Sequence, residues 1–105
     1  MQEEEYLSKV EEILNHLNHE FEELENAELE NCLVEDVVYS DGVLKVKVED
    51  LGTYVFNKQT PNLQLWLSSP ISGPQRFEFD NEQGIWINNR TSEPLIKKLN
   101  EELEN

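Results

Sequence analysis

The chain has little of what a disulfide scaffold or a membrane protein needs. Cys32 is the only cysteine among 105 residues, which excludes an intramolecular disulfide framework and a Cys-x-x-Cys metal or redox site. No apolar run approaches the roughly 20 residues of a membrane-spanning helix, so no membrane association is expected. The N-terminal residues are acidic, unlike those of a signal peptide or an Arg-rich transit peptide.

Positive charge is also scarce. Eight Lys and Arg residues stand against 23 Asp and Glu residues, which gives a formal net charge of -15 and a pI near 4.3. A nucleic-acid partner is therefore not expected, because its phosphates would be repelled, whereas cations and basic protein surfaces would be attracted. The length and the 37% hydrophobic content suit one core, so residues 1–105 are predicted to form a single domain.

The carboxylates concentrate in the first third of the chain, where Lys9 is the only Lys or Arg. Thirteen of the 23 lie there: Glu3, Glu4, Glu5, Glu11, Glu12, Glu20, Glu22, Glu23, Glu25, Glu28, Glu30, Glu35 and Asp36. The same segment has a helical pattern, with apolar residues recurring every three or four positions. This spacing predicts a helix from about Glu3 to Glu25. Its apolar face comprises Tyr6, Val10, Ile13, Leu14, Leu17, Phe21 and Leu24.

The middle of the chain alternates between apolar and polar residues, as half-buried strands do. The Asp41-Gly42 pair is a strong hairpin-turn signal. Strands are predicted at Cys32 to Tyr39, Val43 to Val48, Thr53 to Lys58, Leu63 to Ser68, Arg76 to Phe79 and Ile85 to Ile87. Prolines and a glycine interrupt Ser69 to Pro74, which is predicted to be an irregular corner outside any strand ladder.

A second helix is predicted near the C-terminus. Thr91 or Ser92 can cap it, Pro94 falls in its first turn, and its apolar stripe comprises Leu95, Ile96, Leu99 and Leu103. Consecutive strands joined by short turns indicate an antiparallel meander, and two amphipathic helices need an apolar surface to cover. The predicted fold class is therefore α+β, a two-layer αβ sandwich with both helices on one face of a five- to six-stranded antiparallel sheet.

Strand alternation also assigns an orientation to Trp66. If Leu63, Leu65 and Leu67 face the helices, then Gln64 and Trp66 lie on the opposite face of the sheet. Tyr54 and Phe56 are core candidates on the preceding strand, which leaves Asn57 beside Trp66. An exposed Trp among amides suits protein recognition. Alternatively, Trp66 only covers sheet backbone, as many single surface aromatics do.

Helical geometry arranges the acidic residues of the first helix in rows. At 100 degrees per residue, Glu4, Glu11 and Glu22 line one flank of its solvent-facing side; the other flank carries Glu5, Glu12 and Glu23, with His19 between the rows. Carboxylates are hard oxygen ligands for iron, Mn(II), Mg(II) or Ca(II), but an open ridge cannot enclose an ion. Weak, poorly selective metal binding is expected. The alternative is that these charges serve solubility alone.

Two histidines offer a second arrangement on the same helix. Glu12, His16, His19 and Glu23 are spaced by four, three and four residues, which stacks them along one stripe. A mixed set of imidazoles and carboxylates suits Fe(II), Co(II) or Zn(II) better than oxygen ligands alone. The other interpretation is a solvated face without a ligand role.

One long run carries a specific resemblance. The segments GTYVFNKQTPN from Gly52 to Asn62, QLWLSSP from Gln64 to Pro70 and SGP from Ser72 to Pro74 closely resemble the signature of the frataxin family. The acidic first helix, the Asp41-Gly42 turn, Trp86 and the C-terminal helix extend the resemblance loosely over almost the whole chain. It implies the αβ sandwich that the order of elements already predicts.

The resemblance also implies a function. Frataxins bind iron, Fe2+ or Fe3+, weakly through surface carboxylates, and act in iron-sulfur cluster assembly by engaging the cysteine desulfurase and the iron-sulfur scaffold protein. The family's sheet-surface contacts correspond here to Asn57, Gln59, Gln64, Trp66 and Arg76. The metal region corresponds to the helix carboxylates and to Glu35 and Asp36 at the edge of the first strand.

Three further expectations follow from the resemblance. A ferroxidase or iron-chaperone role is the alternative function, although no buried di-iron motif is visible in the sequence. The protein is expected to be a monomer that metal can induce to oligomerise. Its expected location is the mitochondrial matrix or a mitochondrion-derived organelle, with the bacterial cytoplasm as the alternative.

Overall fold

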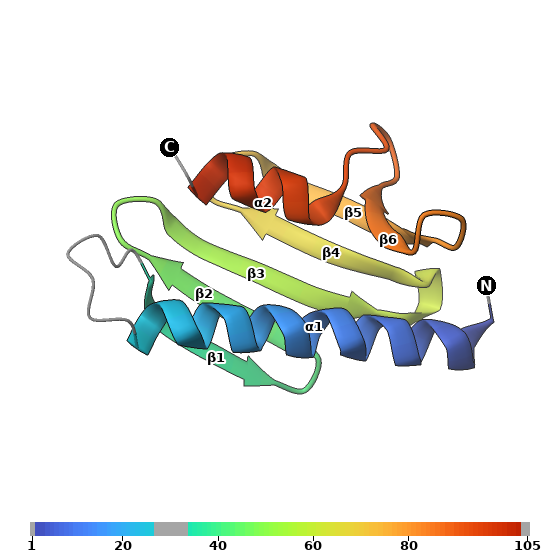
Figure 1. Cartoon of the computed structure of the whole chain (residues 1–105), viewed down its shortest axis with the longest axis horizontal. Helices are drawn as coiled ribbons and strands as arrows, with labels where there is room; N and C mark the ends of the chain where they lie inside the picture. The colour runs from blue at the N-terminus through green and yellow to red at the C-terminus, as the bar shows by residue number, and fades with distance from the viewer. Residues whose placement is uncertain (1, 27–33, 104–105) are drawn as a thin grey trace.

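The computed structural model describes residues 2–26 and 34–103, which form two helices and one sheet (Figure 1). Helix α1 spans Glu3–Asn26 and helix α2 spans Leu95–Leu103. The strands are β1 (Val34–Ser40), β2 (Val43–Val48), β3 (Gly52–Gln59), β4 (Gln64–Ser69), β5 (Gly73–Asp80) and β6 (Ile85–Asn88). A short 3-10 helix, η1 (Thr60–Asn62), joins β3 to β4.

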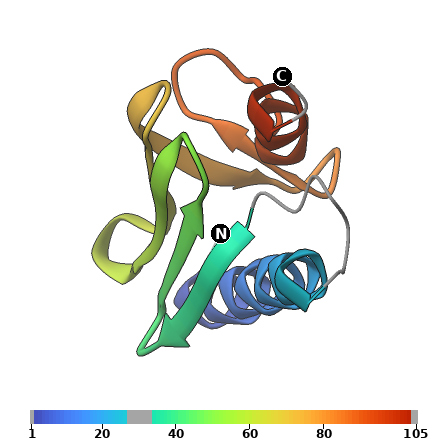
Figure 2. The same ribbon diagram turned by 90° about the vertical axis from the view of Figure 1, so that its left-hand side faces the viewer.

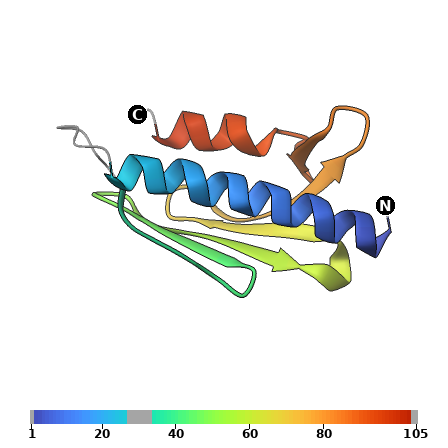
Figure 3. The same ribbon diagram turned by 60° about the horizontal axis from the view of Figure 1, so that its bottom comes forward.

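The six strands lie in sequence order, and each is antiparallel to the next. The first turn contains Asp41 and Gly42, both with positive φ, as the Asp-Gly signal predicts. Both helices cover the same face of the sheet, and no described element covers the other face (Figures 2 and 3). The α+β sandwich is thus confirmed, with six strands.

The core fills the space between the helices and the sheet. Helix α1 buries the residues of the predicted stripe from Tyr6 to Phe21, apart from the half-buried Ile13. Tyr54 and Phe56 on β3 and Leu65 and Leu67 on β4 have no more than 1% of their surface exposed, which confirms the orientation that alternation predicts. The alternate residues of these two strands therefore point toward the outer face of the sheet.

The apolar stripes of both helices are narrower than predicted. Leu24 is 46% exposed because Phe21, one turn earlier, is the last residue of α1 that packs into the core. Ile96 is 42% exposed, whereas its neighbour Leu95 is buried. Adjacent helical residues point about 100 degrees apart, so only one of the two can face the sheet.

The irregular corner predicted for Ser69 to Pro74 is wrong at both ends, because Ser69 belongs to β4, and Gly73 and Pro74 belong to β5. Gly73 pairs with Ser69 and Pro74 pairs with Ser68. The ladder tolerates Pro74 because β6 pairs only with the stretch from Phe77 to Asp80, and no strand lies on the other side of the proline.

Three further predicted starts compare differently with the structure. The start of the first strand at Cys32 is not tested, the fourth strand begins at Gln64 instead of Leu63, and the second helix begins at Leu95. The first strand begins at Val34 among the described residues, and Cys32 lies outside them.

Pro94 precedes α2 rather than lying in its first turn, and its carbonyl accepts a hydrogen bond from the Lys98 amide. The Thr91 hydroxyl accepts a hydrogen bond from the Glu93 amide, so it supports the preceding turn instead of capping the helix.

Candidate functional site

The uncovered face of the sheet presents one row of side chains across three strands. Asn57 on β3 is opposite Trp66 on β4, and Trp66 is opposite Arg76 on β5. These three predicted site residues are therefore neighbours. Such cross-strand pairs place Cβ atoms about 5 Å apart, which lets long side chains interact directly.

The Trp66 indole is held by two of its neighbours. Its Nε1–H donates a 2.9 Å hydrogen bond to Gln64 Oε1. The Arg76 guanidinium lies over the ring, 4.9 Å from the centroid, in cation–π geometry. Trp66 is consequently half-buried instead of standing free, and its ring has a fixed orientation before any partner arrives.

Gln64 is buried beneath this site and supports Trp66. Only 7% of it is exposed, and its Nε2 donates a 3.0 Å hydrogen bond to Glu78 Oε2. The Gln64 amide thus joins Glu78 to Trp66, so it positions the indole more than it offers a free contact. Alternation predicted the face on which Gln64 lies but gave no indication of its burial.

Tyr6 of α1 forms hydrogen bonds with the end of the β3–β4 hairpin. Its hydroxyl donates a 2.7 Å hydrogen bond to the Gln64 carbonyl and accepts a 3.0 Å hydrogen bond from the Gln59 amide. Burial raises the pKa of Tyr6 despite the lowering effect of the hydrogen bonds from Gln59 and Thr60, so the hydroxyl stays protonated. Helix α1 and the outer sheet face are therefore mechanically connected.

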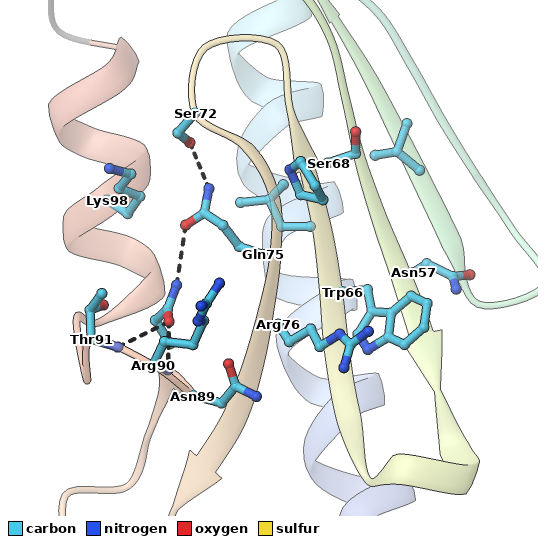
Figure 4. A pocket seen from close by; sticks show the side chains of 14 residues that line it. Asn57, Trp66, Ser68, Ser72, Gln75, Arg76, Asn89, Arg90, Thr91 and Lys98 are labelled. Carbon is cyan, nitrogen blue, oxygen red and sulfur yellow. Dashed lines mark hydrogen bonds between the residues drawn. The ribbon is translucent and has the colours of Figure 1, made fainter.

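A hollow of about 950 Å³ opens beside Trp66 and Arg76 (Figure 4). It extends past β5 to the loop that follows β6 and to α2, which contribute Arg90 and Lys98. Sequence reasoning missed these two residues. They are separated from Trp66 by more than twenty positions, and no spacing signal connects a loop with a strand at that distance.

The predicted acidic residues of α1 are all exposed: Glu4, Glu5, Glu11, Glu12, Glu22 and Glu23, together with His19. Glu35 and Asp36 are exposed on β1, which begins with an irregular register between Val34 and Asp36. Glu35 Oε2 lies 3.3 Å from Lys47 Nζ of β2. We call these exposed carboxylates of α1 and β1 the acidic surface.

The described residues contain no group of three or more His, Cys, Asp or Glu side chains that could share a metal ion. In this structure the side chains of Glu12, His16, His19 and Glu23 do not converge into one such group. His19 Nε2 pairs with Glu23 Oε1 at 3.0 Å, whereas Glu12 and His16 line a separate hollow beside Trp86. Side chains diverge on a convex helix surface, so regular spacing does not bring them together.

The donor chemistry of the acidic surface nevertheless suits hard cations that are held loosely. Carboxylate oxygens are ligands for hard cations, and each of these groups is open to solvent. An ion bound there keeps much of its water. The geometry fits weak attraction of cations and differs from an enclosed resident site.

Comparison with known proteins identifies the family. The family model described as "Frataxin-like domain" matches residues 1–105. Mitochondrial frataxin from Arabidopsis thaliana is 45% identical over 106 residues, covering 100% of this chain and 55% of the relative. The mitochondrial frataxin homolog from Saccharomyces cerevisiae is 43% identical, covering 96% of this chain and 56% of the relative.

The chain belongs to the frataxin family. It spans about half the length of the curated relatives it matches. The names of these relatives support the mitochondrial localisation that the sequence resemblance predicts. Neither helix in the described part of the chain is both long and apolar enough to cross a membrane.

Solved frataxin structures agree with the fold. A trimeric frataxin from Saccharomyces cerevisiae, described as complexed with ferrous iron, matches with a TM-score of 0.80 and 42% identity, covering 91% of this chain and 82% of that one. A frataxin from Psychromonas ingrahamii matches with a TM-score of 0.78, covering 98% of this chain and 89% of that one. It is only 19% identical, so it supports the fold alone.

Proposed function

We propose that this frataxin is an iron-binding accessory protein of iron-sulfur cluster assembly. Its Trp66 face docks on the complex of cysteine desulfurase and scaffold protein, and its acidic surface attracts iron and basic protein. The single observation that supports this most directly is the fixed Trp66 ring, held by Gln64 and Arg76 on a sheet face that no described element covers.

The physical argument rests on the cost of ordering a side chain. An aromatic anchor whose rotamer is already fixed loses little conformational entropy when a partner covers it, so more of the contact energy contributes to affinity. Trp and Arg are also the residues most enriched among binding hot spots. The three-residue row formed by Asn57, Trp66 and Arg76 therefore has the character of a protein-binding centre.

The acidic surface contributes to association rather than to a fixed contact. Exposed carboxylates on one helix create a negative field that accelerates encounter with a basic protein surface and raises the local concentration of cations. The ion arrives as cargo, held by a few oxygens of groups such as Glu11 and Glu22, and it can leave quickly because no closed shell retains it.

The test is cysteine-dependent sulfide production by a cognate desulfurase with its scaffold, measured with and without Fe(II). Trp66→Ala is expected to abolish activation while leaving iron binding unchanged. Ile71→Ala is the matched control, because Ile71 is a 52% exposed apolar residue outside the Trp66 hollow. Equal activation by wild type and Trp66→Ala would contradict the docking role of this face.

An iron-chaperone or ferroxidase role is the second candidate, favoured by the yeast relative described as complexed with ferrous iron. Charge reversal at the helix carboxylates distinguishes the two. Under the chaperone role, it removes iron delivery while Trp66→Ala leaves delivery intact. Under the accessory role, both changes reduce activation of the desulfurase. The residues reversed are Glu11, Glu12, Glu22 and Glu23.

A further inference from the structure

The hollow beside Trp66 has an unusual charge for this protein. Arg76, Arg90 and Lys98 line it, so three of the eight basic residues of the chain meet there. None of its lining residues is Asp or Glu, although the chain carries 23 of them. We call this hollow the basic groove. A protein with a net charge of -15 thus has a hollow whose charged lining residues are all basic.

Two of these cations form no ion pair with any residue that the structure describes. They are Arg76 and Arg90, and both side chains are exposed. Lys98 is partly compensated by Glu93 at 3.8 Å and Glu102 at 4.0 Å. Glu78 lies further along β5, where Gln64 engages it, and it does not line the groove.

Hydrogen bonds within the loop after β6 fix the backbone position of Arg90. Asn88 is only 8% exposed, and its Oδ1 accepts hydrogen bonds from the Arg90 amide at 2.8 Å and the Thr91 amide at 3.1 Å. The Asn89 amide donates a 2.9 Å hydrogen bond to the Arg76 carbonyl, which ties the loop to β5. The backbone around Arg90 is thereby joined to the backbone at Arg76, and Figure 4 shows both side chains at the same hollow.

The distant acidic surface does not cancel the field of the groove. Its α1 part lies in the helix layer, on the other side of the sheet from the row of Asn57, Trp66 and Arg76. Asp36 shares the outer face through its pairing with Lys47, but β1 is three strands away from β4, with about 4.8 Å between neighbouring strands. Packed layers are about 10 Å apart. The screening length at physiological ionic strength is about 8 Å, so the groove presents a locally positive surface to a partner in contact with it.

The residues that line the basic groove also limit which anionic ligand can fill it. Apolar surface from Val55 and Pro74 accompanies the three cations, which come from β5, the loop after β6 and α2. A small ion would contact only one part of an open hollow of about 950 Å³. An extended peptide can place carboxylates on separate cations and an apolar side chain between them.

We propose that the basic groove binds an acidic segment of the assembly partner, one that carries Asp or Glu residues around an apolar residue. This proposal rests on the proposed function and adds the chemistry of the partner segment. The acidic surface then attracts a basic partner region while the basic groove selects an acidic one. Two complementary patches of opposite sign fix the orientation of docking in a way that one patch cannot.

The test uses the full chain and a fluorescein-labelled peptide, Glu-Asp-Leu-Glu-Asp, in an anisotropy titration at low ionic strength. The peptide is expected to bind, and the corresponding amide peptide, Gln-Asn-Leu-Gln-Asn, is expected not to. Arg90→Gln should weaken binding about five- to tenfold, the loss expected for one charge-assisted contact. Arg90→Lys should restore part of it.

Lys97→Gln is the matched control, because it removes the same charge from an exposed α2 position outside the groove. It should change the affinity less than twofold, in keeping with the small effect of an exposed charge. Equal losses in Arg90→Gln and Lys97→Gln would overturn the proposal. Displacement of the peptide by inorganic phosphate at matched ionic strength would do so as well, in favour of a small-anion site.

Two further outcomes separate this proposal from the function on which it rests. If Trp66→Ala abolishes desulfurase activation but Arg90→Gln binds the acidic peptide like wild type, the groove assignment fails and the proposed function stands. If the peptide binds through Arg90 but the protein does not alter sulfide production, the proposed function fails instead. Arg90-dependent self-association without peptide binding would identify the occupant as a second copy of the chain, and the proposal would be wrong.

Discussion

The Tyr54 hydroxyl donates a 2.8 Å hydrogen bond to Glu102 Oε1, which joins the centre of the sheet to helix α2. Ser69 and Ser72 donate 2.6 Å hydrogen bonds to the two oxygens of the same carboxylate. Burial, followed by the hydrogen bond and charge of Glu102, raises the pKa of Tyr54 and keeps it a donor. Only 7% of Glu102 is exposed, so this carboxylate depends on its partners.

Glu102→Gln is therefore expected to destabilise the protein. The amide keeps the shape of the side chain but loses the charge that strengthens three hydrogen bonds, a loss of about 1–3 kcal/mol in the free energy of unfolding. Urea denaturation measures it. Glu101→Gln is the control, since its exposed pair with Lys97 at 3.8 Å contributes less than about 1 kcal/mol. Indistinguishable midpoints for the two variants would contradict the anchoring role.

The same carboxylate predicts a pH dependence. Burial alone raises the pKa of Glu102, but hydrogen bonds from Ser69, Ser72 and Tyr54, together with Lys98, outweigh it and lower the pKa below its usual value of 4.5. Because the folded state has the lower pKa, its stabilising effect is present above about pH 4.5 and is lost as the pH falls through the folded-state pKa.

The measurement is the difference in unfolding free energy between wild type and Glu102→Gln as a function of pH. Gln does not titrate, so the difference isolates Glu102 from the other carboxylates. It should be constant near neutral pH and shrink below about pH 4.5. If the difference in unfolding free energy between wild type and Glu102→Gln stays the same down to about pH 3, the charge of Glu102 is not what stabilises α2.

A third prediction concerns Gly52 at the start of β3. Its φ is +125°, and an added Cβ would lie 2.9 Å from the Pro70 Cβ in the turn between β4 and β5. Gly52→Ala is expected to cost about 2–4 kcal/mol, because both the backbone conformation and the contact are unfavourable. Thermal unfolding at matched conditions measures the loss.

Gly84→Ala is the control for a positive φ without a close contact. Gly84 also has a positive φ, +69°, but nothing lies within 4 Å of an added Cβ. Only the backbone term remains, about 1–2 kcal/mol for an L-residue in a left-handed conformation. If both variants lose the same stability, the close approach of Pro70 to Gly52 is not a determinant of the hairpin geometry.

Local patterns in the sequence were sufficient for the fold. Alternation oriented Tyr54, Phe56 and Trp66 correctly because the period of a strand depends only on neighbouring residues. The same holds for the buried stripe of α1. The error at Pro74 arose because a proline is unfavourable only where its backbone nitrogen would have to donate to a neighbouring strand. The sequence does not show how far β6 extends along β5, so it does not show that Pro74 has no such neighbour.

The candidate site was predictable only where it lies on one hairpin. Asn57 and Trp66 are neighbours through the register of β3 and β4, which alternation anticipates. Arg90 reaches the same hollow through a turn built by Asn88, and the burial of Gln64 depends on Glu78 of another strand. Such contacts depend on how distant elements pack together, so the helical and strand periodicities of the sequence do not predict them.

The acidic surface should make the stability of the protein sensitive to divalent cations. Glu22 and Glu23 lie near the C-terminal end of α1, whose last turn contains no basic residue. Negative charge there opposes the helix dipole, and like charges along the helix each cost a few tenths of a kcal/mol. Millimolar Mg2+ should therefore raise the melting temperature by about 2–5 °C more than NaCl of equal ionic strength.

Neutralising the helix carboxylates should raise the melting temperature at low salt and remove most of the specific Mg2+ effect. The four changes are Glu11→Gln, Glu12→Gln, Glu22→Gln and Glu23→Gln. An equal change of charge away from α1 should keep the Mg2+ effect, because it leaves the acidic surface intact. It comprises Asp41→Asn, Glu49→Gln, Asp50→Asn and Glu82→Gln, all at exposed positions. If both quadruple variants respond to Mg2+ as NaCl alone predicts, and wild type does too, the carboxylates of α1 serve solubility and hold no cation.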